Sequence, residues 1–164
     1  ADDFLRFWFR FVGPNRSSIE AAPDSVYAQT IAPNLADHAA TTFERVCREA
    51  VWAAIRDGTL DPYGAVGTWW YGEDEIDIVG LSPEDDRLLL GECKWTNDPV
   101  GPALVESLRE KATAVRWGPA DRTEQYALFS RSGFTDGIEA AVDDSWELFN
   151  LGRLDGLLRP EAAD

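Results

Sequence analysis

Lysine, histidine, cysteine and methionine are all scarce in this chain of 164 residues. It has no methionine, one histidine (His38), two cysteines (Cys47 and Cys93) and two lysines (Lys94 and Lys111). A single histidine excludes catalytic triads and zinc sites built on histidine, and the cysteines have no C-x-x-C spacing for a metal. Both cysteines lie in segments with an apolar pattern, so we expect buried free thiols rather than a disulfide.

Long apolar runs are missing as well. No stretch approaches the ~18 apolar residues of a membrane span, and no signal peptide is recognisable. We therefore expect a cytoplasmic protein with no membrane partner. Because the chain has no initiator methionine and begins within an apolar helical pattern, we also expect it to be a piece of a longer protein.

Positive charge is the next deficit. Thirty acidic residues face 15 basic ones, 13 of them arginine, which gives a net charge of −15. The composition is typical of a halophilic protein, because salt screens the repulsion between dense carboxylates. Loss of lysine in a GC-rich genome is the alternative explanation. Such a charge argues against general nucleic-acid affinity at ordinary salt, although it leaves room for a local cationic groove.

What is present indicates a folded α/β protein. Hydrophobic residues make up 45% of the chain and seven are tryptophan, which suits one domain with a buried core. Apolar spacing predicts the helices, and alternation between turn residues predicts the strands. In chain order we expect an aromatic helix over 1–12, a connector with turns over 13–33, a helix over 34–56, strands over 65–71, 75–81 and 87–95, a helix over 102–117, a strand over 125–130, a helix over 135–142, a strand over 146–151 and a short helix over 153–158. This order predicts two regions, 1–33 and 34–164, with a mixed sheet in the second.

Acidic residues and a Glu-x-Lys pair fall on neighbouring predicted strands. Side chains alternate along a strand, so Glu92 and Lys94 share a face while Cys93 points the other way. A hairpin that closes without a slip brings Asp77 near Glu92. The Asp77 and Glu92 carboxylates and the Cys93 backbone carbonyl are oxygen ligands of the kind that Mg²⁺ or Mn²⁺ prefers. Glu44, on the preceding helix, could add a carboxylate through a water.

These residue types predict phosphodiester chemistry. A bound metal lowers the pKa of its water and neutralises charge on a scissile phosphate. Lys94 would orient that water or stabilise charge in the transition state. The pattern is equally consistent with a plain ion pair of Lys94 with Glu92 or Asp77 at the edge of a sheet, because a buried charge is costly unless it is paired or metal-bound.

The constellation resembles a known superfamily. Asp77, Glu92 and Lys94, with Glu44 on the first helix, are similar to the site of PD-(D/E)xK nucleases. More closely, nearly the whole chain resembles an uncharacterised C-terminal domain family that follows the AAA+ ATPase and winged-helix parts of many archaeal ATPases. The motifs that carry this resemblance are 4–12, 14–16, 43–44, 69–70, 75–79, 91–95 and 128–135.

The resemblance implies both a fold and an activity. It implies a restriction-endonuclease-like mixed sheet of order αβββαβ, here with an extra helix and strand and an aromatic N-terminal helix. It carries over Glu44, Asp77, Glu92 and Lys94 as site positions, although Ile76 stands where the superfamily usually has proline. The implied function is a Mg²⁺-dependent DNA endonuclease domain attached to an ATPase. The ATPase and winged-helix region, N-terminal to this domain in the same protein, would contribute DNA binding.

Two further residues are candidate nucleic-acid contacts. In the superfamily a basic or polar residue on the helix after the site strand often points to the site, which makes Lys111 a candidate phosphate contact. The alternative is a solvated lysine near Ser107 or Glu110. Trp70 could stack on bases, but the pair Trp69-Trp70 predicts that one of the two packs into the core.

Two other functions stay open at this point. A nuclease-like fold that no longer cuts would be a binding or regulatory module of the ATPase. The acidic composition favours this alternative, whereas the intact Asp77, Glu92 and Lys94 oppose it. A protein-interaction domain that forms a homodimer through the aromatic segment 4–12 is the second alternative.

Overall fold

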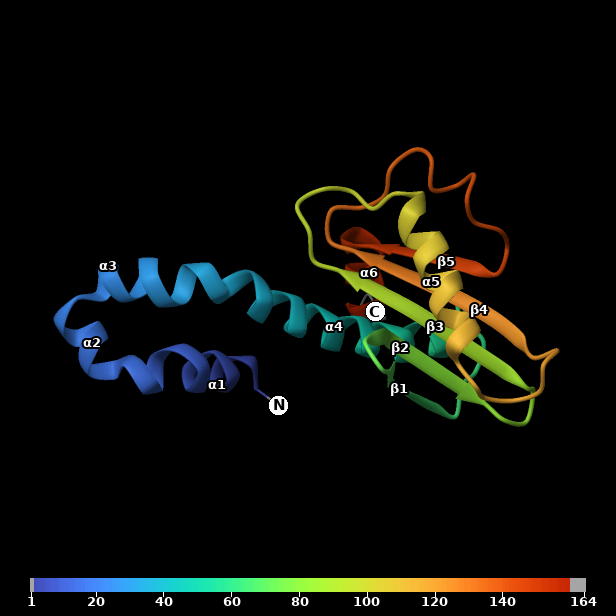
Figure 1. Ribbon diagram of the computed structural model, residues 1–164, viewed down its shortest axis with the longest axis horizontal. Coiled ribbons are helices and arrows are strands. Elements are labelled where there is room, and N and C mark those ends of the chain that lie inside the picture. Colours follow the sequence, from blue (N-terminus) through green and yellow to red (C-terminus); the bar gives the residue numbers. More distant parts are fainter. Residues whose placement is uncertain (1, 160–164) are drawn as a thin grey trace, which may run out of the picture. The chain divides into compact units, whose positions relative to one another are not determined.

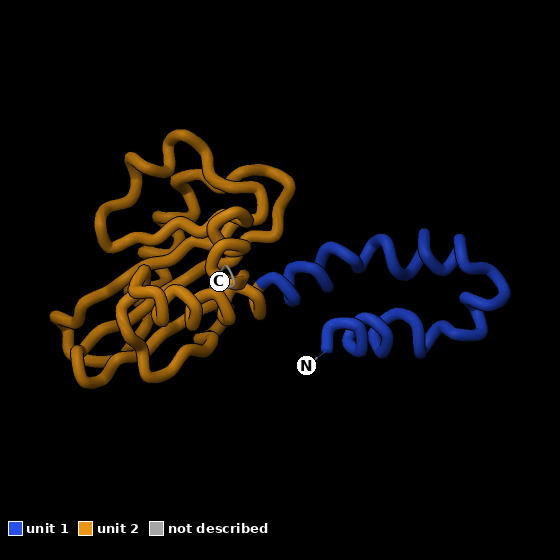
Figure 2. Tube along the Cα trace, turned by 180° about the vertical axis from the view of Figure 1, so that it is seen from behind, with its two compact units in different colours: residues 1–43 blue, residues 44–164 orange. Residues whose placement is uncertain are grey.

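The protein is described here from a computed structural model, which covers residues 2–159. The chain divides into two compact units, residues 1–43 and residues 44–164 (Figure 2). The division lies within helix α4 (Ala32–Asp57). The outer ends of the two predicted regions, residue 1 and residues 160–164, lie outside the described residues.

Unit 1 consists of short helical segments. In chain order they are α1 (Asp3–Phe7), a π-helical turn (Trp8–Val12), a 3-10 turn (Gly13–Asn15), α2 (Arg16–Ala21), α3 (Pro23–Val26), a second π-helical turn (Tyr27–Ile31) and the first part of α4. Over 13–33, where the sequence predicted a connector with short turns, the chain thus forms short helical segments. Pro14 and Pro23 stand at the start of helical turns, where the fixed φ of proline fits and its missing N–H costs nothing.

The predicted aromatic helix forms, but it buries few of its side chains. Phe11 is buried, and the rings of Phe7 and Phe11 pack edge-on against His38 at 5.8 and 5.5 Å between centroids. Phe4 and Phe9 are instead 64% and 70% exposed. The π-helical turn changes the hydrogen-bond spacing from i+4 to i+5, so the buried face differs from the one that a regular helix predicts.

Unit 2 contains a five-stranded mixed sheet with helices on both faces (Figure 1). The strands, in spatial order, are β1 (Ala65–Tyr71), β2 (Asp74–Ser82), β3 (Arg87–Lys94), β4 (Thr123–Ser130) and β5 (Trp146–Asn150). The β1–β2 and β2–β3 pairs are antiparallel, and the β3–β4 and β4–β5 pairs are parallel. The predicted mixed α/β class is confirmed, with α5 (Pro102–Ala114) as the crossover between the parallel strands β3 and β4.

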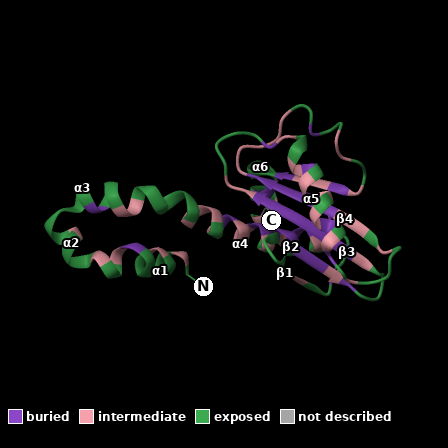
Figure 3. Ribbon diagram, viewed as in Figure 1, coloured by how far each residue is buried: buried purple, intermediate pink, exposed green. Residues whose placement is uncertain are grey.

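The core lies on both faces of the central strand β3, which is buried from Leu88 to Cys93 (Figure 3). Alternate residues such as Leu88 and Leu90 pack under α5 with Leu108. On the other face the Cys93 thiol hydrogen-bonds that of Cys47 on α4. Both thiols are free and buried, as the sequence predicted.

Two helix predictions near the end of the sheet need correction. The helix expected over 135–142 does not form; successive turns link Thr135, Ile138 and Ala141 instead. Gly137 lowers helix propensity there, and the turns bury Ile138. Helix α5 ends at Ala114 rather than at 117, where Val115 adopts an extended backbone. The Arg122 guanidinium donates to the backbone carbonyls of Ala112, Val115 and Trp117 around this end.

The last element is α6 (Leu151–Leu158), slightly longer than predicted, which begins with the Asn150 side chain as its N-cap. No helix within residues 2–159 is long and apolar enough to cross a membrane.

Candidate functional site

The register of β2 and β3 brings Asp77 and Glu92 to the same end of the sheet. Ile78 pairs with Gly91, so Asp77 and Glu92 occupy the next position outward on their two strands. Oδ2 of Asp77 accepts a hydrogen bond of 2.7 Å from the backbone N–H of Cys93. The hairpin therefore closes without the slip that would have separated the two carboxylates.

A β-bulge sets the direction of Asp77. In the β1–β2 pair, Gly67 lies opposite Val79 and Trp69 lies opposite Ile76, so Thr68 alone faces two residues of β2, Asp77 and Ile78. A bulge of this kind bends the strand, turns one side chain and interrupts regular pairing. Here it frees Asp77 from the ladder and lets its carboxylate bond to the backbone of β3.

Glu92 is a buried carboxylate held by two ammonium groups. It is 2% exposed. Nζ of Lys94 lies 3.0 Å from Oε2 of Glu92, and Nζ of Lys111 donates to the other oxygen, Oε1. Lys111 also donates to the backbone carbonyl of Glu75 at 2.7 Å. The two lysines of this chain therefore converge on a single carboxylate and neutralise its charge.

The carboxylates around this point repel one another. Burial, with smaller contributions from the charges of Glu92 and Glu44, raises the pKa of Asp77 to about 6 despite the hydrogen bond from Cys93. Burial also raises the pKa of Glu44, with a smaller contribution from Glu92. Glu44 on α4, Asp77 on β2 and Glu92 on β3 thus form one electrostatic cluster.

Lys94 is the cation with the most open access to this cluster. Burial by itself would lower the pKa of its ammonium, but the adjacent Glu92 carboxylate outweighs burial and the pKa is raised. Its side chain is 37% exposed. Lys94 is therefore a charged donor that can reach a ligand from solvent while it holds Glu92.

The donor set suits a hard divalent cation at Asp77 and Glu92. Within residues 2–159, no three His, Cys, Asp or Glu side chains form a group that could hold a metal ion by themselves. Mg²⁺, however, keeps several waters and is commonly bound through one or two carboxylates. Burial raises the pKa of the Asp77 carboxyl, and a cation bound there would favour its charged form. Glu92 would join once one ammonium moves away.

The two candidate nucleic-acid residues lie in different environments. Trp70 is 72% exposed, whereas Trp69 is partly buried and packs against the core, so one tryptophan of the pair packs on the core as predicted. Lys111 bonds to Glu92 and Glu75 rather than to its helical neighbours Ser107 and Glu110. The resemblance directed Lys111 towards the site as a phosphate contact, but sequence reasoning did not predict its contact with Glu92.

Comparison with known proteins places the chain in a family. The family described as "Archaea bacterial proteins of unknown function" (DUF234) matches residues 8–113. This chain belongs to the DUF234 family. The matched span contains the whole cluster described above, from Glu44 to Lys111.

A relative of this DUF234 chain comes from Methanocaldococcus jannaschii. It is an uncharacterized protein, 30% identical over 153 residues, which is 92% of this chain and 33% of that protein. The chain thus spans about a third of the length of the curated relative that it matches. No solved structure matches the chain significantly.

Proposed function

We propose that this DUF234 chain is a Mg²⁺-dependent DNA endonuclease domain of the PD-(D/E)xK type. The observation that carries the proposal is the convergence of Asp77, Glu92 and Lys94 at one end of the β2–β3 hairpin, with Glu44 in electrostatic contact. These are acidic and basic groups of the kinds that metal-assisted phosphodiester hydrolysis requires.

The element order supports a restriction-endonuclease-like fold. Helix α4, strands β1 to β3, helix α5 and strand β4 follow one another in the order αβββαβ, and β5 and α6 extend it. In that order the acid of β2 and the Glu-x-Lys of β3 belong to adjacent antiparallel strands. The proposal assigns the site to the end of the sheet where these strands carry Asp77 and Glu92.

Each side chain of the cluster has a role in the proposed reaction. A divalent cation, when bound, supplies an activated water and neutralises phosphate charge. Asp77 and Glu92 would hold it, together with the Cys93 backbone carbonyl. Lys94 would donate to the phosphate and stabilise the charge that builds up in the transition state. Glu44 would hold a water of the site.

Before the metal binds, the Lys111 ammonium would supply the positive charge that balances Glu92. Its ammonium contacts the same carboxylate that the cation needs. When the cation takes Glu92, Lys111 would move to a phosphate oxygen, consistent with its place on a helix beside the strand end. Electrostatic competition between Lys111 and the metal is a direct consequence of this assignment.

The partner in this proposal is the remainder of a longer protein. The chain covers a third of the M. jannaschii relative, which leaves room for the ATPase and winged-helix parts that the sequence resemblance implies. With a net charge of −15, this domain would depend on such a partner, or on high salt, to approach DNA.

A second function is favoured by one specific observation. Both carboxylate oxygens of Glu92 already have an ammonium partner, as in a purely structural ion-pair network. Under this alternative the domain does not cut and serves as a binding or regulatory module of the longer protein.

The test is metal-dependent cleavage. Labelled linear, branched and single-stranded DNA would be incubated with Mg²⁺ or Mn²⁺ in multimolar KCl, with wild type, Lys94→Ala and Glu92→Gln compared. We expect cleavage by wild type and its loss in both variants. Glu139→Gln, which changes an exposed acid outside the cluster, is the matched control and should cut like wild type.

Calorimetry with Mn²⁺ separates the two functions when no cutting is seen. If the wild type binds metal without cutting and Asp77→Asn abolishes that binding, the proposed metal site stands and cleavage needs a missing partner. Absence of both cutting and metal binding would establish the non-catalytic module and overturn the nuclease.

A further inference from the structure

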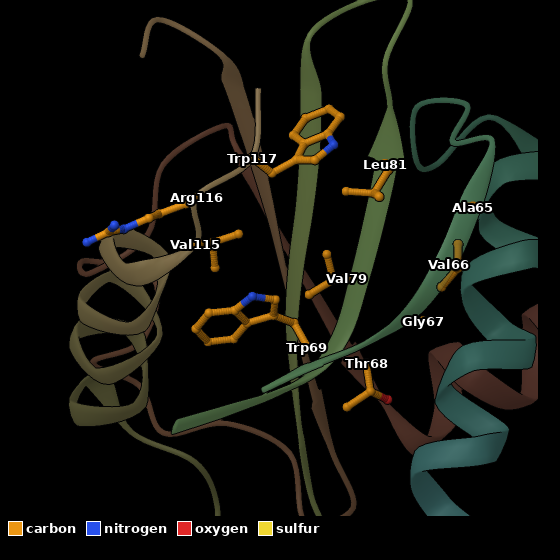
Figure 4. Close-up of a pocket in the computed structure, with 10 residues that line it drawn as sticks. All are labelled: Ala65, Val66, Gly67, Thr68, Trp69, Val79, Leu81, Val115, Arg116 and Trp117. Carbon is orange, nitrogen blue, oxygen red and sulfur yellow. The ribbon is translucent and has the colours of Figure 1, made fainter. Parts of the chain in front are cut away.

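A cavity of about 390 Å³ lies beside β1, at the end of α5. Its apolar lining consists of Trp69, Val79, Leu81, Val115 and Trp117, together with the β1 segment 65–68 (Figure 4). The two indole rings lie at different ends of the lining, with the valine and leucine side chains between them. The volume falls within the range of small-molecule pockets.

Gly67 keeps this cavity open. Side chains two apart on a strand share a face, so a side chain at position 67 would point the same way as Trp69. Thr68 points to the other face, where Arg48 of α4 donates to it at 3.2 Å. A Cβ placed on Gly67 would meet no atom within 4 Å. The cavity is therefore the space that a larger residue at this position would fill.

The cavity adjoins the cluster around Glu92. Lys111 donates to the backbone carbonyl of Glu75, and the next residue, Ile76, pairs directly with Trp69. On the helix side, Val115 follows Lys111 by one turn, about 6 Å along the axis. The cavity and the cluster are therefore close enough to contact neighbouring nucleotides of one strand.

The lining has the chemistry of a base-stacking site. Trp69 stacks on Tyr71, with 6.4 Å between ring centroids and an interplanar angle of 27°, so aromatic surface continues from the cavity along β1. Arg116 is exposed and extends away from the indole rings (Figure 4), where its guanidinium can meet a backbone phosphate. Proteins hold unpaired bases on aromatic side chains of this kind with little preference for sequence.

We propose that the cavity takes one unpaired nucleobase of the DNA strand whose neighbouring phosphate lies at Lys111 and Glu92. The inference rests on the proposed nuclease function and specifies its substrate as DNA with single-stranded character, such as an end, a branch or an extruded base. The exposed Arg116 in the lining and Lys111, one turn before Val115, favour a nucleotide with its phosphates over an apolar peptide side chain.

The decisive variant is Gly67→Leu, which fills the cavity from an unstrained position. Binding of a short single-stranded DNA that carries 2-aminopurine and cleavage-resistant phosphorothioate linkages would be followed by anisotropy and aminopurine quenching, in high KCl with Mg²⁺, so that the cation is present and no cleavage occurs. We expect single-strand affinity to fall about tenfold and quenching to be lost, while duplex affinity and the melting temperature stay at the wild-type values. Trp117→Leu should repeat the loss. Trp52→Ala removes a partly exposed indole on α4 and should leave single-strand affinity and quenching unchanged.

The outcomes separate this inference from the nuclease itself. Equal single-strand affinity of wild type, Gly67→Leu and Trp117→Leu overturns the base site, even if the wild type cuts DNA with Mg²⁺. Quenching that both cavity variants lose supports the base site, even if the metal-loaded domain does not cut. Absence of single-strand binding by the wild type, or binding of apolar peptides instead, overturns the inference and assigns the cavity to protein contacts.

Discussion

Units 1 and 2 differ in how far they bury their phenylalanine side chains. In unit 1, Phe4 and Phe9 are largely exposed. In unit 2, Phe129 and Phe149 are fully buried, with their rings stacked 4.8 Å apart between β4 and β5. A helical hairpin of short segments has little interior, whereas a sheet covered on both faces has a core on each side. The number of aromatic residues in a segment is therefore a poor guide to its stability, because their contribution depends on whether other elements cover them.

Charged pairs show the same contrast. In unit 1, Arg16 and Glu20 form an exposed ion pair at 3.3 Å, one helical turn apart. In unit 2, Lys94 and Lys111 share the buried Glu92. Solvent surrounds both partners of the first pair, whereas the shared Glu92 carboxylate of the second is buried. The same kind of substitution should therefore change the free energy of unfolding far more in unit 2 than in unit 1.

The largest effect is expected from Phe129→Ala. Removal of a buried phenylalanine should lower the free energy of unfolding by about 3–5 kcal/mol, measured by denaturant unfolding in high KCl. Phe9→Ala in unit 1 should change it by less than about 0.5 kcal/mol. Equal effects of the two variants would refute the contrast between the units.

Lys111→Met should have the next largest effect. It leaves one oxygen of the buried Glu92 without its cation, which should cost about 2 kcal/mol of unfolding free energy. Adding Glu92→Gln to Lys111→Met should regain part of this loss, because the unpaired charge disappears. A double variant that is less stable than Lys111→Met would refute the idea that the unpaired charge of Glu92 causes the loss.

Asp77 predicts a pH-dependent effect of smaller size. Its pKa is raised in the folded protein from an ordinary 3.8 to about 6, so the folded state binds the proton more tightly than the unfolded state. The stabilisation is present below the ordinary pKa and is lost as the pH rises through about 6. Asp77→Asn should lack this loss and so gain about 1–2 kcal/mol on wild type between about pH 4 and 7.

The control for Asp77 is the same pH series with added Mn²⁺. The metal should stabilise wild type above pH 6 and leave Asp77→Asn unchanged. Parallel pH profiles for the two proteins would disprove the assignment of the raised pKa to this carboxylate.

Arg16→Ala should have the smallest effect. An exposed pair at i and i+4 contributes about 0.3–0.5 kcal/mol, and high salt screens it further. Thermal melts in low and high KCl would measure this, and a loss above about 1 kcal/mol would mean that unit 1 depends on the pair.

The strands were predicted better than their connections. Alternation located β1, β2 and β3 to within a few residues because one face of each strand must be apolar. The bulge at Asp77 was not predicted, since it depends on how β1 and β2 pair. The helix expected over 135–142 failed because tertiary burial of Ile138 overrode a weak helical pattern interrupted by Gly137.

Sequence reasoning indicated that the candidate residues share one end of the sheet, but it did not predict their contacts. Strand alternation was enough to place Glu92 and Lys94 on one face. The contact of Lys111 with Glu92 joins residues 19 apart through the packing of α5 on the sheet, and no local pattern encodes that packing. The same holds for the cavity at Gly67, which depends on the end of α5.

Because the two lysines of this chain both contact Glu92, the site can be labelled selectively by chemical modification. A reagent that acylates primary amines would meet, besides the α-amino group of the chain, just Lys94 and Lys111. Mass spectrometry of the labelled protein would then read the occupancy of this site directly. Protection by a metal, a nucleotide or a partner would register there without any engineered probe.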